Sequence, residues 1–411
     1  MGEKLALHGG SPVRTDPMPN RALFGEEERS AAIALFDQAI AQQEAFGYNG
    51  PKEEEYERRF VEMMQSGYAD GVNSGTNALF VALGALSLDA MSEVIVPPIS
   101  DPGGVMPVLF CGCVPIPVDA DPGTYNIGPD AIESSISERT RAIIVAHIAG
   151  EPADMDRIVA IAEKNGLYIV EDCAQAHGAT YKGRMVGTIG HTAAFSTMFG
   201  KHHATGGQGG VFFSTHEDLF WKGRRFADRG KPFNIEDSGG NVTAGLNCNL
   251  NELSAAIGVV QLEKLPEIIE RRRSFVSQLD DELQSRSRSV RIGRRLNNTN
   301  GVYWFVRLHL ESGGMSKHDF CEALAAEGIP VNPTYRHIPA EMTWFKNKSV
   351  FGSNGFPWHA SDYQGESDPE YDFPEAIRAT DEHFNLQIHE NFGSREVDDI
   401  VAAIAKIESV G

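Results

Sequence analysis

The stretch "TRAIIVAHIAGEPADMDRIVAIAEKNGLYIVEDCAQAHG", residues 140–178, decides the fold class of this chain. It begins and ends with runs of apolar, largely β-branched residues of the kind that form buried strands. Residues 154–166 between these runs carry apolar side chains at helical spacing and end at Gly166, which predicts an amphipathic helix. A strand, a helix and a second strand, both strands almost continuously apolar, predict a parallel sheet that is buried on both faces.

The same alternation continues on both sides of this stretch. Apolar strands are predicted at 92–98 and 114–121, and residues 70–86 predict a short strand, a turn and an apolar helix. Helices are predicted at 25–40 and 50–64. The sequence therefore predicts an α/β protein with a mostly parallel central sheet covered by helices.

We divide the chain into an N-terminal arm (1–25), a large domain (26–274) and a smaller C-terminal α/β domain (275–411). A long helix is predicted over 251–286, and Pro266 is expected to kink or divide it. The small domain should contain strands and helices and, between residues 340 and 375, a long polar loop with several aromatic residues. Its strands are expected at 301–310 and 384–389, and its helices at 317–328 and 395–408.

Composition excludes several classes of function. The chain has 411 residues and a net charge of -21, which argues against binding to nucleic acid or to an anionic membrane surface. It contains no apolar run as long as a membrane span, and its first residues lack the apolar core of a signal peptide. These features are typical of a soluble cytoplasmic protein.

The five cysteines do not form a convincing metal site. Cys111 and Cys113 lie in an apolar, strand-like run at 108–119, but no second cysteine or histidine pair completes a ligand set. Buried, reduced thiols are the preferred interpretation, and no metal is expected.

Residues 73–79, "NSGTNAL", place small residues between a strand and the start of a helix. The backbone N–H groups of Gly75 and Thr76, and the Thr76 hydroxyl, can bind a phosphate at the positive end of that helix. The alternative is an ordinary tight turn with a helix cap.

Residues 170–178, "VEDCAQAHG", end a buried strand at Asp172, where parallel sheets present ligands. A carboxylate there can pair with a pyridinium nitrogen and keep the ring protonated as an electron sink. Ala174 is small enough for a flat ring to lie against it, and Gln175 can donate to a ring hydroxyl. The alternative is a loop aspartate that caps a turn.

Residues 195–210, "FSTMFGKHHATGGQGG", contain the candidate nucleophile. Lys201 is suited to a Schiff base with a carbonyl cofactor, and Ser196 to a phosphate oxygen. His202 is expected to orient the loop or to contact substrate. In residues 245–253, Asn247 can reach a phosphate. The alternatives are a solvated surface lysine and a capping asparagine.

In this order the segments resemble the DegT/StrS-type sugar aminotransferases, which are fold-type I enzymes dependent on pyridoxal 5'-phosphate. "NSGTNAL", "IVEDCAQAHGATYKGRMVGTIG" and "NELSAAIGVVQL" carry the likeness, which extends over residues 5–410. The opening "LALHGGSPVR" is most similar to members that act on cyclitols and aminobenzoate-type precursors of antibiotics.

The resemblance implies a role for each matched residue. Lys201 would form the Schiff base and move the proton, and Asp172 would pair with the ring nitrogen. Gln175 would contact the ring hydroxyl, and Asn247 would reach the phosphate of the partner subunit in a homodimer with shared active sites. The implied phosphate contacts are Gly75, Thr76 and Ser196.

Two positions depart from the family pattern. Asp101 stands where these enzymes usually have an aromatic residue that stacks on the ring, and Asn249 stands where they have an arginine. Both changes concern the substrate side of the site. By their placement in polar loops, Arg229, Arg336 and His337 are candidate anion contacts, although surface or structural roles explain them equally well.

The expected reaction moves an amino group from glutamate or glutamine to a keto sugar, nucleotide-linked or free, or to a keto cyclitol. Lys201 acts in turn as nucleophile and general acid–base. The alternatives are a pyridoxal-phosphate-dependent sugar dehydratase, in which histidine replaces this lysine, and a non-catalytic regulator or binding protein of the same fold.

Overall fold

A seven-stranded sheet forms the centre of the larger domain in the computed structural model, which describes residues 4–311, 314–335 and 337–410. Among its strands only β9 runs against the others, which confirms the predicted mostly parallel sheet. The strand order is β1 (Tyr68–Val72), β9 (Gly210–Ser214), β8 (Thr192–Ser196), β5 (Tyr168–Asp172), β4 (Thr140–Ala146), β2 (Glu93–Val96) and β3 (Val114–Pro117).

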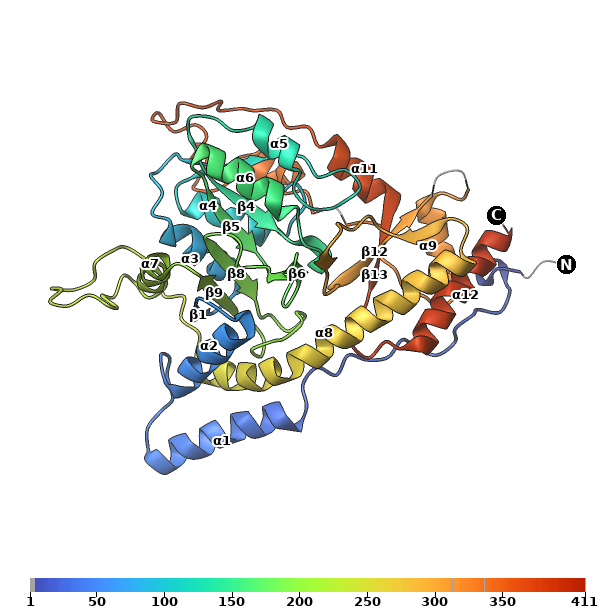
Figure 1. Ribbon diagram of the computed structural model, residues 1–411, viewed down its shortest axis with the longest axis horizontal. Coiled ribbons are helices and arrows are strands. Elements are labelled where there is room, and N and C mark those ends of the chain that lie inside the picture. Colours follow the sequence, from blue (N-terminus) through green and yellow to red (C-terminus); the bar gives the residue numbers. More distant parts are fainter. Residues whose placement is uncertain (1–3, 312–313, 336, 411) are drawn as a thin grey trace.

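Helices cover both faces of this sheet, and the strands show why (Figure 1). In β4, Ile143 and Val145 join one buried cluster, while their neighbours Ala142 and Ile144 join another. Because successive strand residues point to opposite faces, a continuous apolar run is what a strand covered on both sides requires. The covering helices are α2 (Pro51–Met64), α3 (Gly75–Ala85), α4 (Met106–Phe110), α5 (Pro129–Ser134), α6 (Met155–Asn165) and α7 (Glu217–Ala227).

The long helix α8 (Glu252–Arg286) is continuous, so Pro266 does not divide it as the sequence suggested. Proline removes one backbone hydrogen bond, but α8 is held by packing along its whole length. Its first half lies in the core of the large domain, and from Phe275 onward it lies in the core of the small domain. The change of core falls between Ile269 and Phe275, close to the expected domain boundary.

The small domain contains an antiparallel sheet in the order β10, β12, β13 (Figure 1). The N-terminal arm runs along this domain, where Glu327 accepts hydrogen bonds from the backbone of Ala6 and Val13. The predicted strands and helices of the small domain are confirmed. These are β12 (Phe305–Leu310), β13 (His383–Gln387), α9 (Lys317–Ala326) and α12 (Ser394–Val410). The domain also contains β10 (Val290–Ile292) and α11 (Pro374–Glu382), which were not predicted.

The short elements are less regular. Residues 340–375 are mostly loop, as expected, but they include the 3-10 turn η4 (Pro339–Glu341) and the short helix α10 (Thr343–Lys346). A third small sheet joins β11, β6 and β7. The remaining elements are η1 (Ala6–His8), η2 (Pro102–Gly104), η3 (Ile148–Gly150), β6 (Thr180–Tyr181), β7 (Arg184–Met185) and β11 (Thr299–Asn300).

The strand-like run at 108–119 is only partly a strand. Its first residues belong to helix α4, and Gly112, with φ of +74°, turns the chain into β3. A short apolar run does not distinguish a buried helix from a buried strand, which explains the error. Cys111 and Cys113 are unpaired thiols at this turn.

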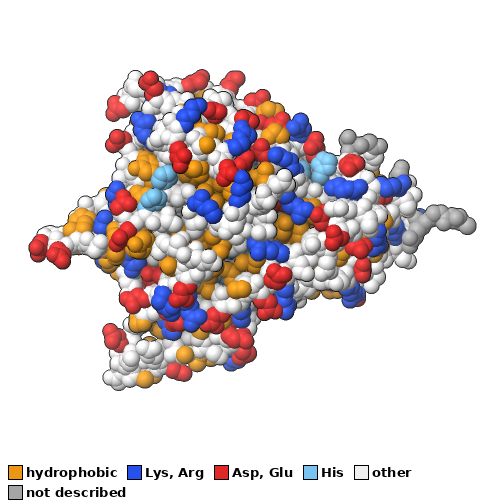
Figure 2. All heavy atoms as spheres, viewed as in Figure 1, with side chains coloured by type: hydrophobic (Ala, Val, Ile, Leu, Met, Phe, Trp, Pro, Cys, Tyr) orange, Lys and Arg blue, Asp and Glu red, His pale blue; other side chains and the backbone are white. Residues whose placement is uncertain are grey.

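Two segments project from the body of the molecule: α1 (Glu26–Gln42) and the loop 229–247 that follows α7 (Figure 1). Both expose large apolar side chains, among them Ile40, at 74% exposure, and Leu246, at 58%. On the face shown in Figure 2, Lys and Arg side chains are interspersed with Asp and Glu. No described helix has the length and apolar character needed to cross a membrane.

Candidate active site

A cavity of about 330 Å³ lies at the carboxyl ends of β5 and β8 and beside the first turn of α3. This is the edge of a parallel sheet where ligands bind in open α/β folds. Strand connections and the small domain supply its remaining walls. The lining residues are Ser74, Gly75, Thr76, Leu79, Asp101, Gly103, Gly104, Asp172, Ala174, Gln175, Ser196, Met198, Lys201, Gln208, Trp304, Tyr335 and His337.

Lys201 reaches the cavity from the segment that follows β8. Its Nζ lies 3.9 Å from the centre of the Trp304 ring, and the residue is only 7% exposed. Burial lowers the pKa of Lys201 to about 8, although the negative charges of Asp172 and Asp101 oppose the shift. A lysine whose pKa is about 8 is partly neutral at a pH between 7 and 8, so its nitrogen can act as a nucleophile and a base.

Asp172 ends β5 and faces the same cavity. Its Oδ1 accepts a hydrogen bond of 3.0 Å from the backbone N–H of Ala174. Burial raises the pKa of Asp172, while this hydrogen bond and the charge of Lys201 act in the opposite direction. No cation of the described residues forms an ion pair with it, so the carboxylate is available to a positively charged ring nitrogen in the cavity.

The start of α3 forms an anion-binding cradle. The Ser74 hydroxyl caps the helix by accepting from the N–H of Asn77, whereas the N–H groups of Gly75 and Thr76 have no partner among the described residues. Ser196 lies against this turn: a Cβ at Gly75 would come within 2.9 Å of the Ser196 hydroxyl oxygen. The geometry therefore brings together Gly75, Thr76 and Ser196, three of the four residues that were predicted to contact phosphate.

Gln175 is held in a fixed orientation on the wall of the cavity. Its Oε1 accepts from the N–H of Ala149 at 2.7 Å, and its Nε2 donates to the Tyr335 hydroxyl at 3.3 Å. One N–H of the side chain remains for a ligand, and Ala174 beside it presents only a methyl group.

The wall opposite the strand ends carries polar side chains suited to a hydroxylated substrate. The Nδ1 atom of His337 is buried without a hydrogen-bond partner among the described residues. Asp101, the residue in the place of the usual aromatic, is exposed at the rim and accepts a hydrogen bond from the N–H of Gly103. Arg336, another predicted contact, lies outside the described residues.

Three predicted residues do not line this cavity. His202 is fully buried and its Nε2 donates to the carbonyl of Val302, which agrees with the first of its two expected roles, orienting the loop, and not with contact to substrate. Arg229 binds the carboxylate of Asp228 and the hydroxyl of Tyr48. Asn247 is exposed on the projecting loop, where its Oδ1 accepts from Asn249.

His202 and its neighbour instead hold the lysine segment in place. His203 hydrogen-bonds through Nε2 to the hydroxyl of Tyr56 on α2, at 2.9 Å, and through Nδ1 to the Nδ1 of His177, at 3.0 Å. Burial lowers the pKa of His203 to about 3, so the ring is neutral and donates only one of these bonds.

The described residues include one buried cluster with the composition of a metal site: His147, Glu171 and Cys173. The ligand atoms of His147 and Glu171 are already engaged. His147 accepts from the N–H of Ala153 and contacts Glu171 at 3.1 Å, and the Glu171 oxygens accept from backbone N–H groups at 187–190. The cluster therefore braces β4 against β5, behind Asp172.

Sequence reasoning missed Trp304, Tyr335 and Gln208. Trp304 and Tyr335 come from the small domain, and their only sequence signal was their aromatic character near a predicted strand and in a loop. Trp304 also donates from Nε1 to the carbonyl of Gly200 at 3.0 Å, so it contacts both Lys201 and the residue before it.

The residues present fit pyridoxal phosphate. A cradle of free N–H groups suits its phosphate, and the unpaired Asp172 carboxylate suits its ring nitrogen. Gly103 leaves room between these groups, because a Cβ there would come within 2.4 Å of the Thr76 hydroxyl oxygen. Lys201 enters the same cavity and can reach the cofactor's carbonyl carbon.

Comparison with known proteins agrees with this assignment. The family model of the DegT/DnrJ/EryC1/StrS aminotransferase family matches residues 27–405. The chain is 33% identical to L-glutamine:2-deoxy-scyllo-inosose aminotransferase of Streptomyces fradiae, over 84% of each chain. It is 31% identical to GDP-perosamine synthase of Escherichia coli O157:H7, over 69% of this chain and 76% of that enzyme.

Among solved structures, the aminotransferase from Psychrobacter cryohalolentis superposes with a TM-score of 0.81 at 27% identity, covering 97% of this chain and 99% of that one. These matches confirm the predicted fold, the aminotransferase activity and pyridoxal phosphate as the cofactor.

Proposed function

Because the chain belongs to the DegT/DnrJ/EryC1/StrS aminotransferase family, we propose that it transfers the amino group of glutamine or glutamate to the ketone of a cyclitol or a sugar. The observation that carries the proposal is the shared cavity of Lys201 and Asp172 beside the first turn of α3. A nucleophilic amine, an unpaired carboxylate and a phosphate cradle are the three protein groups that this chemistry needs.

Each residue has a distinct task. Pyridoxal phosphate, when bound, supplies an electron sink for the negative charge that develops on the donor's α-carbon. The Asp172 carboxylate would hold the ring nitrogen, and the cradle of Gly75, Thr76 and Ser196 would hold the phosphate. Lys201 Nζ would remove the proton from the donor's α-carbon and deliver it to the carbon of the cofactor that carries the nitrogen. Trp304 keeps this amine over its ring, 3.9 Å from the ring centre.

Support for a cyclitol or sugar acceptor comes from the cavity wall and the relatives. Gln208, Tyr335 and His337 present hydrogen-bonding groups, and the buried Nδ1 of His337 lacks a partner in the described chain. A polyhydroxylated ring can satisfy such groups, whereas an apolar substrate cannot. The names of the two relatives, an inosose aminotransferase and a GDP-perosamine synthase, support the same class, and the first supports glutamine as donor.

We also propose that the active unit is a homodimer in which Asn247 completes the partner's phosphate site. Asn247 lies on the projecting loop 229–247, outside the cavity of its own chain. Exposed apolar residues on this loop and on α1, including Leu246 and Ile40, favour burial against a second copy.

The test is an absorbance titration of the protein loaded with pyridoxal phosphate. The visible band of the Lys201-bound cofactor should bleach when glutamine or glutamate is added, with release of the corresponding oxo acid. The bleached protein should recover the band when an inosose or a keto sugar is added. The acceptor that restores the band fastest identifies the substrate class.

Lys201→Ala is the matched variant, because it removes the amine and leaves Asp172 and the cradle intact. We expect it to lose turnover and the band of the lysine-bound cofactor. Turnover equal to that of the unchanged enzyme would overturn the assignment of Lys201. A deoxy product without amine transfer would indicate a dehydratase, and a band that no donor disturbs would indicate a binding protein.

A further inference from the structure

The segment that carries Lys201 is fastened on both sides of the lysine. On one side, Trp304 Nε1 donates to the carbonyl of Gly200 at 3.0 Å. On the other side, Arg21 of the N-terminal arm donates through Nη2 to the carbonyl of His202 at 3.1 Å. The two carbonyls flank Lys201, so the position of its main chain depends on both donors.

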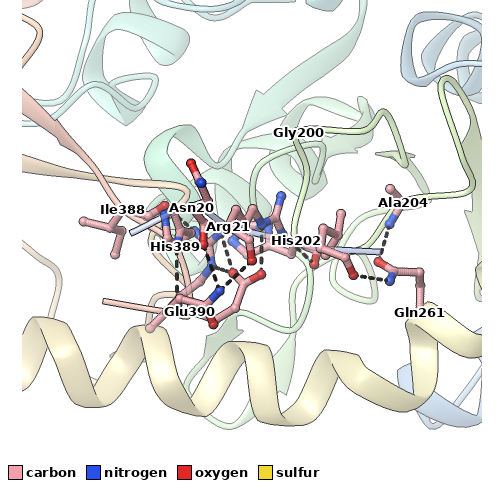
Figure 3. Close-up of polar contacts among 12 residues, drawn as sticks. Asn20, Arg21, Gly200, His202, Ala204, Gln261, Ile388, His389 and Glu390 are labelled. Atoms are coloured by element: carbon pink, nitrogen blue, oxygen red, sulfur yellow. Dashed lines mark hydrogen bonds and ion pairs between the residues drawn. The ribbon is translucent and has the colours of Figure 1, made fainter. Parts of the chain in front are cut away.

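Arg21 also connects this segment to the small domain, as Figure 3 shows. Its Nε donates to Glu390 Oε1 at 2.9 Å. The other oxygen of Glu390 accepts from Nε and Nη2 of Arg272, at 3.2 and 3.0 Å. Burial alone would raise the pKa of Glu390, but the charges of Arg272 and Arg21 hold it below its usual range, so the carboxylate is ionised.

Arg272 connects Glu390 to the residue that precedes Trp304. Its Nη1 donates to the carbonyl of Tyr303 at 2.9 Å, and Tyr303 immediately precedes Trp304. The contacts therefore run from His202 through Arg21, Glu390 and Arg272 to the Tyr303 and Trp304 pair, and back to Gly200. Arg272 is 1% exposed at its side chain, Glu390 8% and Arg21 17%, so solvent screens these charges weakly.

The arm itself does not depend on the Arg21 side chain. His389 Nε2 bonds to the carbonyl of Pro19 at 2.8 Å, and Asn391 Nδ2 donates to the carbonyls of Asn20 and Arg21 at 3.1 and 2.6 Å. Gln261 on α8 further bonds to the carbonyl of Leu23 at 3.1 Å. These contacts anchor the backbone of the arm on either side of Arg21, so its guanidinium is free to act on the lysine segment.

We propose that Arg21 is a positioning residue for Lys201: by holding the His202 carbonyl and the Glu390 carboxylate together, it locks the lysine segment of the large domain to the small domain. The proposal rests on the role of Lys201 in amine transfer and deepens it. Arg21 is absent from the cavity lining and touches no reacting atom, so it acts only through the placement of Lys201. Because a small displacement of a reacting group lowers the reaction rate strongly, the hydrogen bonds that fix the position of Lys201 should affect the rate.

Arg14 provides a matched control on the same arm. Its Nη1 pairs with Glu396 at 3.1 Å and Asp399 at 2.7 Å on α12, and its side chain is 3% exposed. Its described contacts reach the small domain but not the lysine segment. A variant at Arg14 therefore removes an ion pair between the arm and the small domain, and leaves the hydrogen bonds of Arg21, Arg272 and Trp304 around the lysine segment intact.

The experiment compares Arg21→Gln, Arg21→Lys and Arg14→Gln in the full-length, cofactor-loaded protein. Amide hydrogen exchange of peptides covering residues 198–206 reports the fastening directly and needs no substrate. Rapid mixing with glutamine then reports the rate of band bleaching and its dependence on donor concentration.

We expect Arg21→Gln to speed exchange in 198–206 and to slow bleaching at saturating donor by about 10-fold, with the half-saturating donor concentration unchanged. Arg21→Lys should be intermediate in both readouts, because an ammonium reaches one of the two acceptors but lacks the fork that spans both. Arg14→Gln should match the unchanged protein in both. If Arg21→Gln and Arg14→Gln behave alike in exchange and in rate, Arg21 merely anchors the arm and the proposal is overturned.

Arg21→Lys also keeps the proposal testable if Arg21→Gln does not fold. An exchange rate and a bleaching rate identical to those of the unchanged protein in the lysine variant would then contradict the proposal. A failure of the donor to bleach any protein, with faster exchange only in the Arg21 variants, would instead refute the proposed function and leave the fastening established.

Discussion

The ends of β5 and β8 differ from the projecting loop 229–247 in how they present functional side chains. Asp172 and Ser196 stand at strand ends, face one cavity and meet the first turn of α3 there. Arg229 and Asn247 on the loop lie outside that cavity and bond to their own neighbours. Strand ends are fixed by hydrogen bonds to neighbouring strands of the same chain. A residue on a projecting loop can contact a ligand only when another surface covers the loop.

The largest expected effect tests the strand-end part of this comparison. Asp172→Asn keeps the shape of the side chain but removes the charge that would hold the ring nitrogen protonated. We expect the rate of the first half-reaction to fall by about 10²- to 10³-fold, the loss typical of a preorganised electrostatic group. Rapid-mixing absorbance with glutamine measures this rate.

Asp101→Asn is the control for the loss of a carboxylate in the same cavity. Asp101 sits at the exposed rim and caps η2 through the N–H of Gly103, a bond that asparagine can also accept. The rate of the first half-reaction in this variant should stay within about threefold of that of the unchanged protein, because a solvent-exposed charge interacts weakly with the reacting groups. If Asp172→Asn and Asp101→Asn slow the first half-reaction equally, the carboxylate of Asp172 at the strand end has no special role.

The next effect tests the loop. Asn247→Ala should weaken cofactor retention by about 10-fold, because a hydrogen bond to a charged phosphate would be lost. The cofactor dissociation constant, followed by absorbance during dilution, measures this change. Asn241→Ala on the same loop is the matched control: its Nδ2 bonds only to the carbonyl of Arg229, and it should retain cofactor normally.

A mixed dimer shows whether the contact crosses between subunits. One chain carries Lys201→Ala and the other Asn247→Ala, so only one of the two sites contains the lysine, and it lies in the chain that carries Asn247→Ala. If Asn247 acts within its own chain, that site has the altered asparagine. If Asn247 acts in trans, the only lysine-containing site keeps the partner's intact Asn247 and binds cofactor normally. Weak retention in that site would place Asn247 within its own chain and contradict the shared site.

The difference between these regions also explains what the sequence could and could not predict. A continuous apolar strand fixes where β5 ends, so Asp172 was placed at a strand end from local pattern alone. Trp304 and Tyr335 join the cavity from the small domain, more than a hundred residues away in the chain, and no local periodicity reports such a contact. For the same reason the sequence left two roles open for His202, and its tertiary contact with the Val302 carbonyl favours the orienting role.

The errors in secondary structure have a related origin. Pro266 lowers the local preference for helix, but packing against two successive cores keeps α8 continuous. The run at 108–119 is apolar throughout, and only the three-dimensional position of Gly112 decides where helix α4 gives way to strand β3. Local sequence thus predicts elements well where burial is uniform and less well where two elements share one apolar run.

The last expected effect concerns pH and sharpens the account of the strand-end cavity. Burial lowers the pKa of Lys201 from 10.5 to about 8, so the neutral amine becomes the main form above about pH 8 rather than above pH 10.5. Attachment of pyridoxal phosphate needs this neutral amine. The attachment rate should therefore rise about 10-fold per pH unit below pH 8 and level off above it, as rapid-mixing absorbance can record.

Asp172→Asn supplies the internal check on this titration. The negative charge of Asp172 favours the protonated form of Lys201 and holds the pKa of the lysine higher than burial alone would. Removing that charge should shift the midpoint of the attachment rate to lower pH. Asp228→Asn, at a residue that does not line the cavity, should leave the midpoint unchanged. A rate that climbs steadily to pH 10 in the unchanged protein would show that Lys201 keeps the pKa of a solvated lysine. That result would contradict the burial of Lys201 in the cavity at the strand ends.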